Sequence, residues 1–457
     1  MTVEKQLSTS QPQDSLIEVA VPPAGGSETP PVSSRTAWTS VAILLLLLIV
    51  SILDRQIIAL QIEPMKADLG LSDTQIGVLQ GIAFALFYVT ASLPLGWAVD
   101  RYSRRGIAFL GVTIWSLASA GCGLANNFWQ LFAGRMLVGV GEATLNPTAV
   151  SLIGDLFPSE KTGAPMGAYS AGVYLGSGVA LTVGGLVVGL FAGDPVVHFP
   201  LIGNVASWQA VFIITGLPGI FLAFAAFLMH DPRPPRRAVA RGMKATDSGF
   251  IRFAASNVTL LSCTFIGFGL SGFAFYAISA WTPAYLARTF NLPMASIGWT
   301  WGLVVASSGA LGALGGGVVI DRVYRAGIRD ACLVVPAITG LLALPFIAGA
   351  YFMPTPSLTL AALGIGLLLF SVAGPSAYAT MARMAPRTLR GQVTAGFTLV
   401  SGLLASGLGP VSVGLVTDKL LGDEARVGTS IAMVVSLALP IQILLLLTAR
   451  PLLRKHP

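Results

Sequence analysis

The chain has 457 residues, of which 54% are hydrophobic and only 10% are charged. Soluble domains carry about 25% charged residues, so this chain lacks the polar surface of a water-soluble fold. The net charge of +7 does not indicate nucleic-acid binding, because the basic residues lie in short segments between apolar runs rather than in one folded patch. Composition therefore predicts an all-α membrane protein in contact with a lipid bilayer.

The apolar segments follow one another in regular succession after a polar start. Residues 1–37 are rich in Ser, Pro, Gln and Thr, and we expect a disordered cytoplasmic tail. A spanning helix needs about 20 apolar residues. Twelve such segments are predicted, at 38–61, 74–98, 106–125, 129–153, 163–192, 208–229, 256–286, 296–320, 331–352, 358–382, 393–417 and 428–449.

The longest polar interruption, 231–255, is the predicted cytoplasmic linker between two six-helix bundles, 38–230 and 256–449, and a second tail covers 450–457. Most Lys and Arg residues lie in the segments that share a side with the termini, whereas the opposite loops hold only Lys66, Arg288, Lys419 and Arg426. Cytoplasmic loops carry the basic excess, so both termini are predicted to be cytoplasmic. The short loops and the lack of a targeting segment favour a bacterial inner membrane.

The second and eighth spans end in related sequences. Residues 96–101 read GWAVDR and residues 317–322 read GVVIDR. Parallel repeats of this kind mark the two pseudo-symmetric bundles of the major facilitator fold. A carboxylate at each helix end can pair with arginines across the halves when the inner side closes. The predicted cytoplasmic gate comprises Asp100, Arg101, Arg104, Asp321 and Arg322; the alternative is that these charges only fix topology.

Further motifs resemble a known family. Arg135 precedes Gly139 and Gly141 in the RxxxGxG pattern of major facilitator helix four, and Glu142 follows directly. Together with LDR at 53–55, DLFP at 155–158 and WTPAYL at 281–286, this resembles the spinster-like branch, known for sphingolipid and lysolipid transporters, of which the chain looks like a bacterial homologue. The resemblance implies alternating access, proton coupling and an amphipathic, lipid-like substrate.

Four ionisable residues lie well inside the predicted spans: Asp54, Arg55, Arg135 and Glu142. Charges at this depth are costly and usually serve function. Counting about 1.5 Å per residue, we expect Asp54 to meet Arg135 and Arg55 to lean toward Glu142. An arginine that moves between the two carboxylates would load or release a proton, so these residues are the predicted proton-coupling and substrate-binding set. The alternative is a static salt-bridge cluster.

Aromatic residues suggest a cavity that is polar on one side and apolar on the other. The candidates are Tyr169, Tyr174, Phe273, Tyr276 and Trp281, although aromatic side chains more often serve packing. The sequence predicts no cofactor other than protons. GK[ST] does not occur, the GxGxxG at 267–272 lies in an apolar helix, and the three Cys and three His residues lack metal-ligand spacing.

The sequence thus predicts a monomeric secondary active transporter, proton-coupled and specific for an amphipathic or lipid-like anion. The alternatives are a major facilitator carrier of small organic acids, sugars or drugs, or an uncoupled lipid facilitator. A small acid would favour a second cation inside the C-terminal half, where the sequence shows none. An enzyme is not expected, because no catalytic constellation is present.

Overall fold

A computed structural model describes residues 33–158, 161, 163–191, 193–194, 196–199, 202–232, 247–386 and 389–454. Most of the predicted N-terminal tail, residues 233–246 of the predicted linker and residues 455–457 therefore lie outside the described residues. Twelve helices in the described ranges are long and apolar enough to cross a membrane, which confirms the predicted number of spans. Their ends differ from the predicted ends by a few residues.

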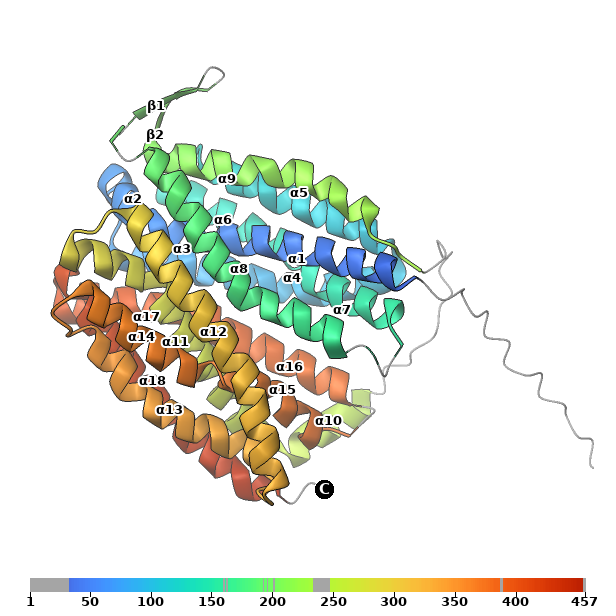
Figure 1. The fold of residues 1–457 in the computed structure, drawn as a ribbon. Coiled ribbons are helices and arrows are strands. Elements are labelled where there is room, and N and C mark those ends of the chain that lie inside the picture. The colour runs from blue at the N-terminus through green and yellow to red at the C-terminus, as the bar shows by residue number, and fades with distance from the viewer. Residues whose placement is uncertain are drawn as a thin grey trace, which may run out of the picture.

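The N-terminal half forms the upper layer in Figure 1. Its spans are α1 with η1, α3 with α4, α5, α6 with α7, α8, and α9 with η3; a short hairpin joins α8 to α9, with Val196 opposite Ala206. The elements are α1 Ser34–Gln56, η1 Ile57–Leu60, α2 Ile62–Leu69, α3 Asp73–Gln80, α4 Ile82–Arg101, α5 Arg104–Cys122, α6 Phe128–Glu142, α7 Leu145–Leu156, α8 Gly163–Leu190, β1 Val196–Phe199, β2 Gly203–Ala206, α9 Ser207–Ala223 and η3 Phe224–Leu228.

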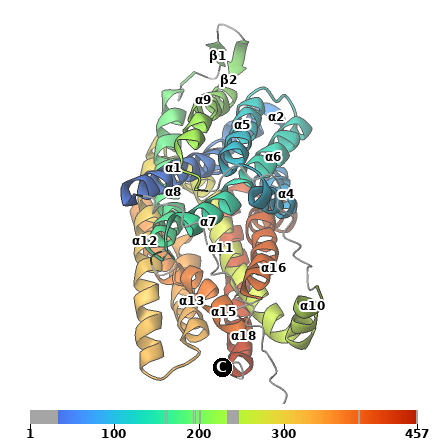
Figure 2. The same ribbon diagram turned by 90° about the vertical axis from the view of Figure 1, so that its right-hand side faces the viewer.

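The C-terminal half forms the lower layer in Figure 1. A helix outside the twelve spans, α10, occupies the end of the predicted linker and lies beside this half (Figure 2). Its Phe250 and Phe253 pack against an apolar cluster of the same half. The elements are α10 Asp247–Ser256, α11 Val258–Phe290, α12 Met294–Arg325, α13 Ala331–Ala350, α14 Pro356–Phe370, α15 Ala373–Met384, α16 Arg390–Gly402, η4 Leu403–Leu408, α17 Gly409–Leu415, η5 Val416–Leu421, η6 Glu424–Arg426 and α18 Val427–Leu453.

The two halves meet most closely where α8 crosses α12. A Cβ atom on Gly298 of α12 would lie 2.5 Å from the Leu181 carbonyl oxygen of α8, so only glycine permits this backbone approach. Small residues serve the same purpose in other packed membrane helices. The same holds where α3 meets η4, because a Cβ on Gly81 would lie 2.3 Å from the Gly407 carbonyl oxygen.

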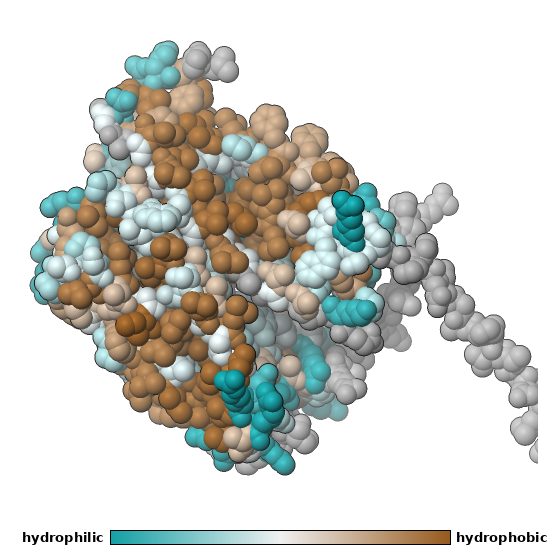
Figure 3. All heavy atoms as spheres, viewed as in Figure 1, coloured by the Kyte–Doolittle hydropathy of each residue, from teal (hydrophilic) through white to brown (hydrophobic). Residues whose placement is uncertain are grey.

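The halves are joined at one end of the molecule and apart at the other. One apolar cluster combines both halves: Leu60 and Leu181 share it with Trp281, Ile297 and Trp301. We call the end of the molecule that carries α2, the hairpin and η6 the closed end. Toward the opposite end, each half has an apolar cluster of its own, and the surface is hollowed between the layers on the right of Figure 3.

The outer faces of the spans carry large exposed apolar side chains, including Leu190 at 75% and Phe221 at 78% exposure. In water such a surface would aggregate, whereas lipid tails cover it at no cost. The chain is therefore an integral membrane protein.

Candidate transport site and gate

An ion pair lies at the centre of the N-terminal half. Arg55 occupies the last turn of α1, just before that helix tightens into η1, and Glu142 is the last residue of α6. Arg55 Nε donates to Glu142 Oε2 at 2.5 Å, as the sequence analysis expected, and Ser51 Oγ donates to the same oxygen at 2.7 Å. The Glu142 side chain is fully buried, whereas that of Arg55 is 23% exposed. The arginine is therefore the member that solvent or a ligand can reach.

The second expected pair takes a different form. Arg135 Nη1 donates to the main-chain oxygen of Asp54 at 3.2 Å, not to its carboxylate. The carboxylate instead accepts from Ser119 Oγ of α5 at 2.8 Å. The depth estimate from the sequence was correct, but it did not include which way the Asp54 side chain points. Asp54 and Arg135 are both almost completely buried.

The two buried carboxyl groups of this cluster each have one oxygen without a hydrogen-bond partner among the described residues. These oxygens are Asp54 Oδ2 and Glu142 Oε1. A bare carboxylate oxygen away from water is costly, and a bound proton removes that cost. Each of the two groups therefore has an oxygen at which a proton can bind.

A chain of polar and aromatic groups continues from Arg55 toward the end opposite the closed end, which we call the open end. The Arg55 guanidinium lies 4.6 Å from the Phe84 ring and 5.2 Å from the Tyr88 ring. Asn146 Nδ2 donates to Tyr88 Oη at 2.8 Å, and Tyr169 Oη donates to Asn146 Oδ1 at 2.8 Å. Asn146 is exposed although it lies within a span. A polar side chain is therefore accessible at this depth of the span.

The C-terminal half faces this cluster with α11. Gln56 Nε2 donates to Ser279 Oγ at 3.1 Å, and the Tyr276 ring makes an edge contact with the Phe275 ring, with centroids 5.7 Å apart. Tyr174 of α8 makes an edge contact with the Phe275 ring, with centroids 6.3 Å apart. The two halves therefore meet here through both polar and aromatic contacts.

Two of the predicted cavity residues lie elsewhere. Phe273 packs against the apolar cluster of the closed end. Trp281 is fully buried, and its indole Nε1 donates to the Pro410 carbonyl oxygen at 2.9 Å. Trp281 therefore serves the core rather than a cavity wall, because its one polar atom needs a partner that the α17 backbone supplies.

The predicted cytoplasmic gate residues lie at the open end. Arg104 is buried and pairs with Asp155 and, at 3.4 Å, with Asp231. The Arg101 guanidinium lies 3.9 Å from the Trp97 ring of its own helix. Asp100, Asp321 and Arg322 are exposed. The role of these residues as a gate stays a prediction.

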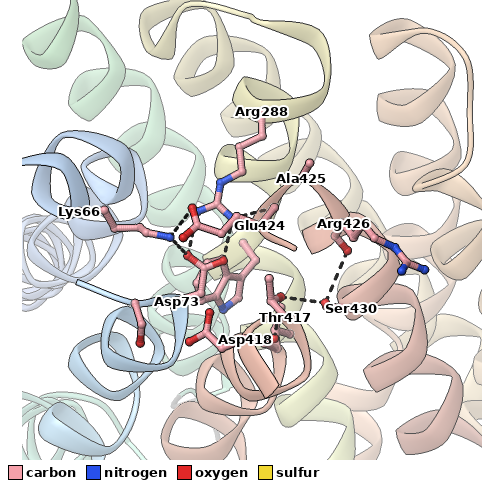
Figure 4. A network of polar contacts seen from close by, with 12 residues as sticks. Lys66, Asp73, Arg288, Thr417, Asp418, Glu424, Ala425, Arg426 and Ser430 are labelled. Atoms are coloured by element: carbon pink, nitrogen blue, oxygen red, sulfur yellow. Dashed lines mark hydrogen bonds and ion pairs between the residues drawn. The ribbon is translucent and has the colours of Figure 1, made fainter. Parts of the chain in front are cut away.

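The closed end holds an ion-pair network that the sequence analysis missed (Figure 4). Arg288 of α11 donates from Nη1 and Nη2 to Asp73 of α3 at 2.7 and 2.8 Å and from Nε to Glu63 of α2 at 2.7 Å. Lys66 of α2 bridges Asp73 and Glu424 of η6. The network therefore joins the two halves across their interface. Asp73 is fully buried, and the side chains of Arg288 and Lys66 are each 8% exposed.

A further bond ties the α3 N-terminus to the C-terminal half, because the Thr74 N–H donates to Asp418 Oδ2 at 2.6 Å. Lys66 and Arg288 had been interpreted only as loop charges. A usable signal was present: acidic residues accompany the few basic ones in the same loops, at positions 63, 68, 73, 423 and 424.

The comparisons with known proteins agree with this architecture. The family description "Major Facilitator Superfamily" matches residues 44–410. The chain belongs to this superfamily. Its members are transporters rather than enzymes, and no group of His, Cys, Asp and Glu in the described residues is suited to hold a metal ion.

Several superfamily members are similar over most of their length. The "Probable L-galactonate transporter" of Escherichia coli K12 is 28% identical over 442 residues, which are 91% of this chain and 92% of that protein. "Protein spinster homolog 1" of Xenopus tropicalis is 26% identical over 414 residues, 86% of this chain and 75% of that protein.

Among solved structures, a bacterial homologue of the human lysosomal transporter spinster, in an inward-facing and unoccupied conformation, superposes with a TM-score of 0.74. It covers 92% of this chain and 97% of that one at 22% identity, so it bears on the fold alone. The sequence match to spinster homolog 1 agrees with the resemblance to spinster proteins inferred from the sequence.

Proposed function

We propose that this transporter moves an organic anion together with a proton, and that the closed end faces the outside. The observation that carries the proposal is the Arg55–Glu142 pair, in which the cation is 23% exposed and the carboxylate is fully buried. An anionic substrate that enters from the open end meets Arg55 first. Because cytoplasmic loops carry the basic excess, the open end is assigned to the cytoplasm.

Coupling follows from competition for one guanidinium. When a substrate carboxylate or phosphate takes Arg55 Nε, Glu142 Oε2 loses its cationic partner and keeps only the Ser51 hydroxyl. A buried carboxylate without a cation is costly, so Glu142 then takes up a proton. Substrate and proton binding thus favour one another, and the coupling is reciprocal. The Asp54 carboxyl, held by Ser119, is the second proposed proton site.

The substrate class we favour is an amphipathic anion. Arg55, Tyr88 and Asn146 supply a charged and polar wall. Phe275 and Tyr276 of α11 supply aromatic groups from the second half, and Tyr174 of α8 contacts Phe275. A second candidate is a sugar acid, because the relative that matches 91% of this chain is described as a probable L-galactonate transporter. Both candidates present an anion to Arg55. We further propose a monomer in a bacterial inner membrane.

The test is uptake into proteoliposomes of a fluorescent lysophosphatidate and of L-galactonate by wild type and Arg55→Gln. A charge-assisted hydrogen bond is worth about 1.5–3 kcal/mol, so the variant should raise KM about 10- to 150-fold for the true substrate. Arg426→Gln, which removes an exposed cation at the closed end, is the matched control and should behave as wild type. Uptake of either anion that Arg55→Gln leaves unchanged would refute the anion site.

A further inference from the structure

A pocket separate from the central site lies at the closed end. It has a volume of about 420 Å³ and lies where α2, α8 and α9 meet the start of α12. Its lining residues come from both halves: Gln61, Pro64, Val188, Phe191 and Val211 from the first, and Met294 from the second. Pockets that hold small molecules start at about 300 Å³ and are mostly apolar, with a few placed polar groups. This pocket fits that description.

The polar group is Gln61. Its side chain is only 1% exposed, and its amide Nε2 has no hydrogen-bond partner among the described residues. An unpaired buried N–H costs about 1–3 kcal/mol, so such groups normally have an acceptor. Gln61 lines the pocket, so an acceptor oxygen of a molecule bound there would satisfy this amide, while the other walls are largely apolar.

The level of the pocket indicates where that oxygen comes from. The span of α8 ends at Leu190, that of α9 begins at Ser207 and that of α12 begins at Met294, so the pocket lies where the apolar spans end. In a bilayer this level is the interface between acyl chains and headgroups. The ester carbonyls that join the two lie there. Asp194, exposed at the rim, disfavours an anionic headgroup and suits one that carries an amine.

We propose that this pocket binds an acyl chain of a zwitterionic ester phospholipid from the adjacent leaflet, whose ester carbonyl accepts the Gln61 Nε2 hydrogen. Because Pro293 and Met294 belong to α12 and the other walls to the first half, a bound chain contacts both halves. The pocket exists only while the halves are joined here. A lipid that binds it therefore stabilises the closed end, independently of the transported substrate.

The experiment uses phosphatidylethanolamine with a photoreactive diazirine on the first part of an ester-linked acyl chain, in proteoliposomes of the full chain. Cross-links are mapped by peptide mass spectrometry. In wild type we expect labelling at Phe191 and Met294 at least fivefold above that at Leu186, a 61% exposed residue of the outer surface. Labelling no higher than at Leu186 would mean that the lipid does not prefer the pocket to the outer surface and would overturn the proposal.

Two variants test the apolar contacts of the pocket and its hydrogen bond separately. Val188→Trp fills the pocket and should lower labelling at Met294 at least fivefold, whereas Leu186→Trp on the same helix should leave it unchanged. Equal labelling at Met294 in the two tryptophan variants would refute occupancy of the pocket by the acyl chain.

Gln61→Leu keeps the side-chain volume and should lower labelling by the ester lipid about fivefold, which corresponds to about 1 kcal/mol for one hydrogen bond. It should not affect the dialkyl ether analogue. An equal effect on both lipids would refute the carbonyl contact.

Discussion

Removing Arg288 should open the closed end. Its guanidinium holds Asp73 through two hydrogen bonds of 2.7 and 2.8 Å, Glu63 through one of 2.7 Å and the Glu424 carbonyl through one of 3.1 Å. Glu63 and Glu424 are 38% and 57% exposed, and exposed pairs contribute little. The estimate therefore depends on Asp73, which is fully buried.

Loss of one member of a buried ion pair costs about 3–5 kcal/mol. Lys66 still binds Asp73 in the variant, so we take the lower value, about 3 kcal/mol. Each 1.4 kcal/mol is a factor of ten, and Arg288→Met should thus shift the equilibrium away from the closed-end conformation by about 100-fold.

The assay is the distance distribution between nitroxide labels at Ala67 and Leu420, two exposed positions on opposite halves of the closed end. In Arg288→Met a longer distance should become the main population. Arg426→Met, which removes an exposed cation at the same end, should retain the short distance of wild type. An unchanged distribution in Arg288→Met would show that the apolar cluster, not the ion pairs, holds this end.

Two other predictions concern stability. Gly298→Val places a Cβ 2.5 Å from the Leu181 carbonyl oxygen. The free energy of unfolding should therefore fall by about 1–3 kcal/mol, measured as a lower Tm. Gly315→Val, at a position with open space around the Cβ, should change the Tm little. Burial opposes ionisation of Asp330, but hydrogen bonds from Arg450 and Arg454 outweigh it and lower the pKa of Asp330 below its usual value. The stability that these hydrogen bonds contribute is complete above pH about 4 and is lost as the pH falls through the lowered pKa. Tm should therefore fall more steeply below pH 4 in wild type than in Asp330→Asn. Parallel curves of Tm against pH would contradict the stabilising role of the Asp330 carboxylate.

The fold was predictable because the membrane simplifies the sequence signal. Apolar segments of about 20 residues can only be spans, and the twelve predicted ones correspond to the twelve in the structure. The Arg55–Glu142 pair followed from depth alone, because both residues lie in helices of known direction. Side-chain direction did not follow: Asp54 turns toward Ser119 on α5, a contact that helical rise cannot give.

The network at the closed end was missed for a different reason. Its members lie at the ends of helices and in loops, at positions where charges are ordinarily exposed. Lys66 and Asp73 become buried only because α2 and α3 pack against the end of α11 and η6, more than 200 residues later in the chain. Such long-range burial leaves no periodic pattern. Trp281 was misplaced for the same reason, since its partner Pro410 is 129 positions away.

The central claim, proton coupling through Glu142, is tested most directly by comparing two modes of transport in Glu142→Gln. Glutamine keeps the shape and can still accept from Arg55 and Ser51, but it cannot release a proton. We expect uptake driven by a pH gradient to be lost, while exchange of labelled for unlabelled substrate continues at equal pH. Gradient-driven uptake that persists in Glu142→Gln would contradict the account.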